Sequence, residues 1–247
     1  MVILQPYTDY DKIVDSLIEN NYPEEFCIAL SFEPAFIRTL MKAGFLVMSY
    51  QDKEALLLPK LHRERSVLFF KDLHIPRSVR PFLSRYTLKP FDALHPIMEA
   101  CIAVHGEDWL TKPLRDALSG LEWSQEQSAP SAPVQNRQVQ LNSPELSEHD
   151  GHTFCSAFGL YRDSELVAGE FGVFCGAVYT SYSGFYREKS TGTTQMILTA
   201  RFLEERGFAF WDLGMPLEYK NRLGAVALER TEFIQKFRGA RLVHPKL

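Results

Sequence analysis

Apolar positions follow a helical period in the first half of the chain, interrupted by short apolar runs. Intervals of three and four between apolar residues predict helices over 9–20, 36–43, 76–85, 94–104 and 110–121. Short apolar runs bounded by polar or turn residues predict strands over 55–59, 65–70 and 86–90. This half therefore combines helices with a few strands.

The pattern becomes strongly β after residue 151. Apolar runs over 153–161, 166–174 and 177–186 are joined by short polar turns, which predicts an antiparallel meander. An amphipathic helix over 195–206, an apolar strand over 208–213, a helix near 219–223 and a last strand around 231–237 are predicted to follow. This order is typical of N-acyltransferases of the GNAT type.

Residues 124–150 separate the two halves and hold little that could be buried. Glutamine, serine, proline and glutamate dominate the segment. We therefore expect an α+β protein with a small N-terminal α/β domain over 1–121 and a mobile polar linker or insertion over 122–150. A GNAT-like acyltransferase domain with a mixed, mostly antiparallel sheet is expected over 151–247.

Composition agrees with an ordinary globular chain, because 45% of the 247 residues are hydrophobic and 23% are charged. No apolar run approaches the roughly 20 residues of a membrane span, and the start of the chain lacks the pattern of a secretion signal. The four cysteines form no C-x-x-C pair and the histidines are scattered, which favours buried thiols over a metal site. The expectation is a cytoplasmic protein without membrane contact, metal or cofactor.

The net charge of −4 hides an uneven distribution. Residues 60–89 contain eight lysines and arginines against two acidic residues, and residues 230–247 contain five against one. Such segments are compatible with phosphate binding, and equally with charges that are simply solvated. The candidates for RNA contact are Arg63, Arg65, Arg77, Arg80 and Arg85.

Asp212 is the strongest single candidate for chemistry. It ends a buried strand, where α/β sheets place their ligands, although it could instead cap the turn that contains Gly214. The loop 187–194 has one glycine, a poor match to a coenzyme A pyrophosphate loop. Arg187 could bind a phosphate or pair with a carboxylate. Trp109 could stack on a base or belong to the core.

Several segments resemble one family in one order. L-H-I-P-R-S at 73–78 is similar to the family's L-H-I-x-R-S, D-W-L-T at 108–111 to T-W-I-T, and G-E-F-G-V at 169–173 to G-G-x-Y-G-V. F-Y-R at 185–187 is similar to F-S-R, and Asp212 followed by L-G-A at 223–225 to D-x-Q and S-L-G-A. Over about residues 26–238 the chain resembles the leucyl/phenylalanyl-tRNA–protein transferases.

The resemblance implies an enzyme that moves an aminoacyl group from the 3′ end of an aminoacyl-tRNA to the N-terminal amine of an acceptor protein or peptide, a reaction of the N-end rule of protein degradation. The donor ester is already activated, so no cofactor is implied. The family assigns proton removal to an acid at the position of Asp212 and to a glutamine two residues on, where this chain has Gly214. The family's glutamate on the third strand falls at Tyr182.

The aminoacyl pocket implied by the resemblance also departs from the family. Positions that are apolar there correspond here to Glu170, Tyr179, Gly184, Met196 and Trp211, and Ser183 lies beside them on the third strand. An unpaired carboxylate at Glu170 would be costly beneath a leucyl side chain. The donor has therefore changed, toward a polar or cationic side chain, or the transfer reaction has been lost.

Two rival functions remain open from the sequence. A GNAT-fold protein that binds an RNA end or a peptide amine without catalysis would explain Gly214 and Tyr182. An acetyl-CoA N-acetyltransferase would fit the fold, but the loop 187–194 speaks against it.

Overall fold

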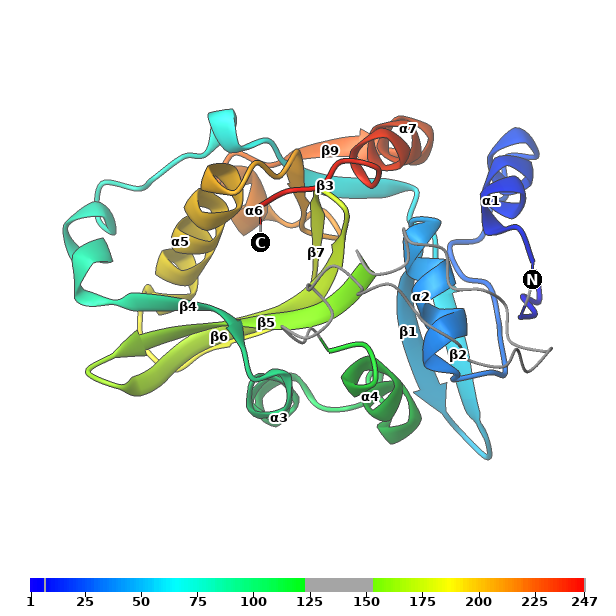
Figure 1. Ribbon diagram of the computed structural model, residues 1–247, viewed down its shortest axis with the longest axis horizontal. Coiled ribbons are helices and arrows are strands. Elements are labelled where there is room, and N and C mark those ends of the chain that lie inside the picture. Colours follow the sequence, from blue (N-terminus) through cyan, green and yellow to red (C-terminus); the bar gives the residue numbers. More distant parts are fainter. Residues whose placement is uncertain (7, 123–152, 247) are drawn as a thin grey trace, which may run out of the picture.

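The computed structural model describes residues 1–6, 8–122 and 153–246, and it contains a two-stranded and a seven-stranded sheet (Figure 1). The helices are α1 (Tyr10–Glu19), α2 (Pro34–Lys42), α3 (Leu94–His105), α4 (Lys112–Ser119), α5 (Thr191–Glu205), α6 (Glu218–Arg222) and α7 (Arg230–Ala240), with 3₁₀ helices η1 (Phe70–Asp72) and η2 (Arg80–Arg85). The strands are β1 (Leu46–Gln51), β2 (Ala55–Lys60), β3 (Glu64–Leu68), β4 (Thr87–Asp92), β5 (Thr153–Arg162), β6 (Glu165–Cys175), β7 (Val178–Tyr186), β8 (Phe210–Asp212) and β9 (Val226–Glu229).

The large sheet has the order β4-β5-β6-β7-β8-β3-β9. Its pairs are antiparallel except β7 with β8, which run parallel. The predicted α+β class with a mixed, mostly antiparallel sheet is confirmed. The predicted order of a three-stranded meander, a helix and a parallel strand is confirmed as well, in β5, β6, β7, α5 and β8.

Two layers cover the sheet. Helix α5 packs on one face, where Ile197, Ala200 and Leu203 are fully buried at intervals of three residues. Helices α2 and α3 pack on the opposite face (Figure 1). Each face therefore has its own hydrophobic core.

Close packing at Gly172 keeps β6 and β7 together beneath α5. A Cβ there would lie 2.2 Å from the carbonyl oxygen of Thr180 and 2.9 Å from the ring of Tyr179. Only glycine lets these two strands and the Tyr179 ring approach so closely.

The predicted last strand over 231–237 is wrong. These residues belong to α7, and the strand at this end of the sheet is β9, just before them. Phe233, Ile234, Phe237 and Ala240 are the buried side chains of α7. Their spacing is helical, so one stripe of the helix meets the core. The helix predicted over 76–85 is reduced to η2, and β1 was not predicted.

The large sheet draws strands from both predicted domains. β3 and β4 precede residue 121, yet β4 pairs with β5 and β3 pairs with β8 and β9. The division at 121 therefore does not separate two sheets, and the division into domains stays a prediction. Residues 123–150 of the predicted linker lie outside the described residues.

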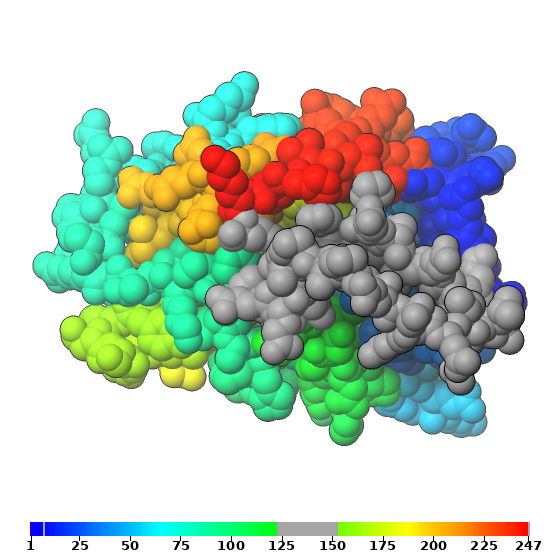
Figure 2. All heavy atoms as spheres, in the orientation of Figure 1, coloured from blue at the N-terminus to red at the C-terminus, as the bar shows by residue number. Residues whose placement is uncertain are grey.

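Helix α7 lies beside helix α1 (Figure 1). Figure 2 shows the C-terminal segment beside the N-terminal one, and ion pairs join α7 to the start of α1. Arg238 pairs with Asp15 at 2.6 Å, and Arg241 donates a 2.9 Å hydrogen bond to Asp11 Oδ1.

All four cysteines are free and buried, as predicted. Burial raises the pKa of the Cys27 thiol to about 11 and that of Cys101 to about 12. Separately, no helix of residues 1–6, 8–122 or 153–246 has the length and apolar character that spanning a membrane requires.

Candidate functional site

Asp212 ends β8 and is fully buried. Its Oδ1 accepts hydrogen bonds from Arg65 Nε at 3.0 Å and from the amide of Gly214 at 2.9 Å. Its Oδ2 accepts one from the hydroxyl of Thr180 at 3.0 Å and a second from Arg65 Nη2. Four donors thus hold the carboxylate in one orientation. Asp212 therefore fits both interpretations from the sequence: it caps the turn through the amide of Gly214, and it is a buried acid at the end of a strand.

Arg65 is the partner of Asp212, which corrects its predicted place on a basic surface. Only 2% of the residue is exposed, and its guanidinium lies over the ring of Phe233 at 4.6 Å. Its Nη1 lies 3.2 Å from His62 Nδ1. Burial and the neighbouring Arg65 lower the pKa of His62 to about 2, so this imidazole is neutral and can accept the bond.

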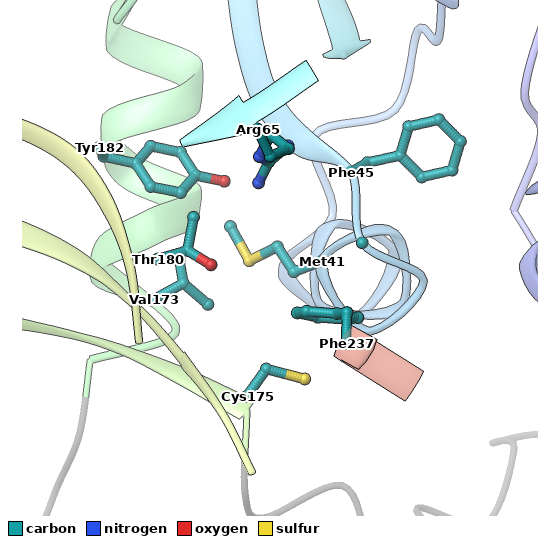
Figure 3. A pocket seen from close by; sticks show the side chains of 9 residues that line it. Met41, Phe45, Arg65, Val173, Cys175, Thr180, Tyr182 and Phe237 are labelled. Carbon is teal, nitrogen blue, oxygen red and sulfur yellow. The ribbon is translucent and has the colours of Figure 1, made fainter. Parts of the chain in front are cut away.

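A small cavity adjoins this ion pair. It is lined by Met41, Gly44, Phe45, Arg65, Val173, Cys175, Thr180, Tyr182 and Phe237. Figure 3 shows Arg65, Thr180 and Tyr182 around the same space as the thioether of Met41. Its lining combines the polar side chains beside Asp212 with apolar groups from α2 and α7.

Glu170 forms a second buried polar cluster. It is 5% exposed, and its oxygens accept hydrogen bonds from the Ser181 hydroxyl at 2.7 Å and from Gln195 Nε2 of α5 at 2.8 Å. Ser181 Oγ also accepts a 2.8 Å bond from the indole of Trp211. Burial raises the pKa of Glu170 to about 7, because the hydrogen bonds from these neutral groups compensate only part of the desolvation.

Large aromatic side chains fill the space around Glu170. Tyr179 and Trp211 are fully buried, with ring centroids 6.0 Å apart. The Tyr179 hydroxyl has no hydrogen-bond partner among the described residues. Met196 packs at the edge of the same cluster and is partly buried. Gly184 lies opposite Glu170 in the β6–β7 register, where a Cβ would come within 3.2 Å of Glu170 Cβ.

The two polar clusters lie on opposite faces of the sheet. Thr180 pairs with Asp212 and Tyr179 with Trp211 in the β7–β8 register, and successive side chains in a strand point to opposite faces. Glu170 contacts α5, on the face of Trp211. The structure therefore unites Glu170, Tyr179 and Trp211 as expected, and it separates their side chains from that of Asp212.

Tyr182 lies on the face of Asp212, and its hydroxyl accepts a 3.0 Å bond from the amide of Val47 in β1. Trp109 stacks nearly parallel on Phe171, with centroids 6.4 Å apart, and its ring centroid lies 6.3 Å from that of Tyr182. The indole is partly buried against the core, which supports the core interpretation. Burial raises the pKa of the Cys101 thiol, and the neighbouring Ser183 offsets part of that rise.

Arg187 is exposed at the end of β7. Its Nη1 donates a 2.9 Å bond to the carbonyl of Leu166, and its guanidinium lies 5.3 Å from the ring of Phe185. Among the described residues it forms no ion pair.

The remaining candidate arginines are exposed but do not share one surface. Arg77, Arg80 and Arg85 lie in and before η2, where Arg85 stacks over the ring of Phe82 at 4.6 Å. Phe82 itself is 40% exposed. Arg63 precedes β3, and Figure 1 places the start of β3 far from η2. The structure thus leaves a basic and aromatic surface at 77–85 and sets Arg63 apart from it.

Sequence reasoning missed Lys220, Thr180, Ser181 and Gln195. Lys220 lies in α6 and is 7% exposed, with Nζ hydrogen-bonded to the carbonyls of Leu213 and Met215. Thr180 and Ser181 are consecutive polar residues in the mostly apolar strand β7, and this pattern could have indicated a buried polar site. A single lysine in a polar helix gave none.

Comparison with known proteins connects this site to one family. The family model described as leucyl/phenylalanyl-tRNA protein transferase matches residues 146–238. A leucyl/phenylalanyl-tRNA–protein transferase of Pseudomonas entomophila is 27% identical over 174 residues, which cover 68% of this chain and 65% of that protein. The transferase of Hahella chejuensis is 26% identical over 213 residues, covering 84% of this chain and 78% of the relative.

Solved structures resemble the chain only loosely. The C-terminal domain of a putative lysylphosphatidylglycerol synthetase from Agrobacterium fabrum has a TM-score of 0.37 at 12% identity, covering 88% of this chain and 62% of that one. A GCN5-related N-acetyltransferase from Kribbella flavida has a TM-score of 0.35 at 13% identity, covering 92% and 76%.

The matched segment 146–238 contains Glu170, Asp212 and Lys220, and therefore the centres of both polar clusters. The Pseudomonas match spans just under two thirds of that relative. The resemblance seen in the motifs is confirmed: the chain is similar to the leucyl/phenylalanyl-tRNA–protein transferases.

Proposed function

We propose that this chain transfers an aminoacyl group from the 3′ end of an aminoacyl-tRNA to the N-terminal amine of a protein. The observation that carries the proposal is the position of Asp212, a buried carboxylate at the end of β8 inside the segment matched by the family model. Charged tRNA is a cytoplasmic substrate, so the proposal includes that compartment.

The reaction needs orientation more than activation, because the aminoacyl ester already stores the required free energy. The new amide bond forms as the amine nitrogen attacks the ester carbonyl, the ester bond to the tRNA breaks, and the proton lost by the amine is balanced by the one gained by the released tRNA hydroxyl. In this proposal Asp212 supplies a fixed negative charge near the reacting amine. The four hydrogen bonds to its oxygens keep that charge in place.

We propose that the donor side chain differs from leucine and phenylalanine and carries a hydrogen-bond donor or a positive charge. The support is Glu170, which is buried on the face of the sheet that meets α5 and has neutral hydrogen-bond partners. It forms no ion pair with any described residue. A cationic donor side chain would supply the missing counter-charge.

Exposed Arg77, Arg80 and Arg85 are proposed to bind the phosphates of the tRNA. The Phe82 ring beside them offers a surface on which a base could stack. Arg65 is excluded from this role because it is buried against Asp212.

The direct test is incubation with a complete mixture of charged tRNAs and an acceptor peptide library, followed by mass spectrometry. We expect peptides whose mass grows by one aminoacyl residue at the N-terminus. Asp212→Asn should abolish this product while tRNA binding persists. Full transfer by Asp212→Asn would contradict the assigned role of this carboxylate.

A second candidate is a non-catalytic protein that binds an RNA end or a peptide amine. It is favoured by the complete pairing of Asp212, which leaves the carboxylate no exposed surface. Tight tRNA binding without any mass increase in the same assay would select this candidate. Tight binding of coenzyme A in calorimetry would instead favour an acetyltransferase.

A further inference from the structure

Lys220 places a buried ammonium at the turn that follows Asp212. Its Nζ donates to the carbonyl oxygen of Leu213 at 2.6 Å and to that of Met215 at 2.7 Å. The residue is 7% exposed although it lies in the short, otherwise exposed helix α6. Burying an ammonium costs free energy unless hydrogen bonds or opposite charges replace its hydration. The buried position of Lys220 therefore indicates a role for its charge.

These bonds complete the fixation of the turn. The carbonyl of Gly214 accepts a 2.7 Å bond from the amide of Ser66 in β3, so three successive carbonyls of the turn are held. The amide of Gly214 in turn donates to Asp212 Oδ1 at 2.9 Å. Gly214 adopts a φ of 72°, a left-handed conformation that glycine allows without steric strain. The position of the Asp212 carboxylate is thereby linked to Lys220.

The ion-pair partner of Asp212 is Arg65 and not Lys220. Arg65 already forms a two-point ion pair with that carboxylate. The charged groups that act on Lys220 from the surrounding strands are Asp212 of β8, Glu170 of β6 and Arg65 of β3. Burial outweighs the two carboxylates and lowers the pKa of Lys220 to about 8.

We propose that Lys220 is a positioning residue for the transfer reaction, which holds the Leu213–Met215 turn so that Gly214 and Asp212 face the aminoacyl ester. The inference rests on the proposed function and adds to it a residue that the family motifs do not contain. The ammonium form donates the stronger hydrogen bonds to the two carbonyls, so loss of the proton loosens the turn.

The variants are Lys220→Met, which removes charge and donors, and Lys220→Arg, which keeps both. Arg222→Met is the matched control, because Arg222 lies on the same helix, is exposed and pairs with the exposed Glu218. We expect Lys220→Met to lower kcat roughly 100-fold, as a small displacement of a reacting group does, and to weaken binding of the aminoacylated tRNA end. Lys220→Arg should recover most of the rate, and Arg222→Met should equal wild type.

The pH profile separates positioning from simple structural support. In wild type, kcat should fall as the pH rises past the Lys220 pKa of about 8. In Lys220→Arg this fall should disappear, because a guanidinium stays protonated. The acceptor amine titrates equally in the wild-type and Lys220→Arg reactions, so the difference between their pH profiles is due to Lys220. If Lys220→Met folds and keeps full kcat, or if Lys220→Arg has the wild-type profile, the inference is wrong.

A binding measurement distinguishes this inference from failure of the proposed function. The probe is a non-hydrolysable 3′-aminoacylamino analogue of the tRNA acceptor end, titrated by calorimetry. A wild-type protein that binds the analogue but transfers no aminoacyl group from charged tRNA would end the proposed function. Weaker binding by Lys220→Met than by Arg222→Met would then still support Lys220 as the residue that shapes the site. If Lys220→Met and Arg222→Met bind the analogue equally, or if wild type does not bind it, the inference about Lys220 is wrong.

Discussion

Arg65 and Asp212 stand 147 positions apart in the chain and form a buried two-point ion pair that joins β3 to β8. The pair connects two residues to which the sequence assigned separate roles, one in RNA binding and one in catalysis. It also makes the candidate site depend on a strand from the N-terminal half.

Breaking this pair should destabilise the fold. Arg65→Met leaves the Asp212 carboxylate buried with two of its four donors, and we expect a loss of about 3–5 kcal/mol in the free energy of unfolding. Removing both charges in Arg65→Met/Asp212→Leu should cost less than the single change. Urea unfolding measures both. Arg63→Met, at an exposed neighbouring position, is the control, and an equal small effect of Arg63→Met and Arg65→Met would contradict the structure.

Glu170 should make stability depend on pH. Its pKa is raised from 4.5 to about 7 in the folded state, so its contribution is fully present below pH 4.5 and is lost as the pH rises to about 7. The loss amounts to roughly 3 kcal/mol. In Glu170→Gln this part of the pH dependence should vanish. Unfolding free energies of the two proteins at pH 5 and pH 8 give the difference, and parallel curves would show that Glu170 is not responsible.

Glu170→Met should also change the donor that is transferred. Methionine would make the proposed aminoacyl site beside α5 apolar, so leucyl or phenylalanyl donors should gain relative to polar or cationic ones. Discrimination by a buried polar contact reaches about 10⁴-fold, so the change in the donor profile should be large. Competition among charged tRNAs in one reaction measures it. An unchanged donor profile would remove Glu170 from specificity and leave the transfer reaction in place.

Binding of tRNA should depend steeply on salt and on the surface at 77–85. Each phosphate contact releases a counterion, so affinity should fall by orders of magnitude between about 50 and 200 mM salt. Arg77→Ala and Arg80→Ala should each reduce the slope of log affinity against log salt by about 1. Arg222→Ala should leave the slope unchanged. A slope unaffected by either surface arginine would place the tRNA elsewhere.

Two glycines near the site should respond differently to alanine. At Gly214 a Cβ would meet Leu46 Cδ1 at 3.6 Å, an ordinary contact, so only the positive φ of 72° opposes the change. We expect a cost of about 1–2 kcal/mol. At Gly224 a Cβ would lie 2.0 Å from the carbonyl oxygen of Asp72, so Gly224→Ala should destabilise far more. Thermal unfolding of the two variants measures both losses of stability. Equal losses for Gly214→Ala and Gly224→Ala would contradict the prediction.

Local patterns in the sequence determined much of the fold. Apolar runs joined by short polar turns gave the β5–β7 meander, and helical spacing gave α1, α2, α3 and α5. The apolar run that ends at Asp212 placed this acid at the end of β8. These features depend on residues close in the chain, and burial alone is enough to select them.

The tertiary structure alone decided the composition of the site. Asp212 and Trp211 are neighbours in β8 and therefore lie on opposite faces of the sheet. Packing of β6 against α5 then places Glu170 on the face of Trp211, which depends on elements far apart in sequence. The Arg65–Asp212 pair and the contact of Lys220 with the turn also arise only when β3, β8 and α6 meet. The sequence around a charged residue does not show which residue will pair with it, because the two partners come together only when the chain has folded.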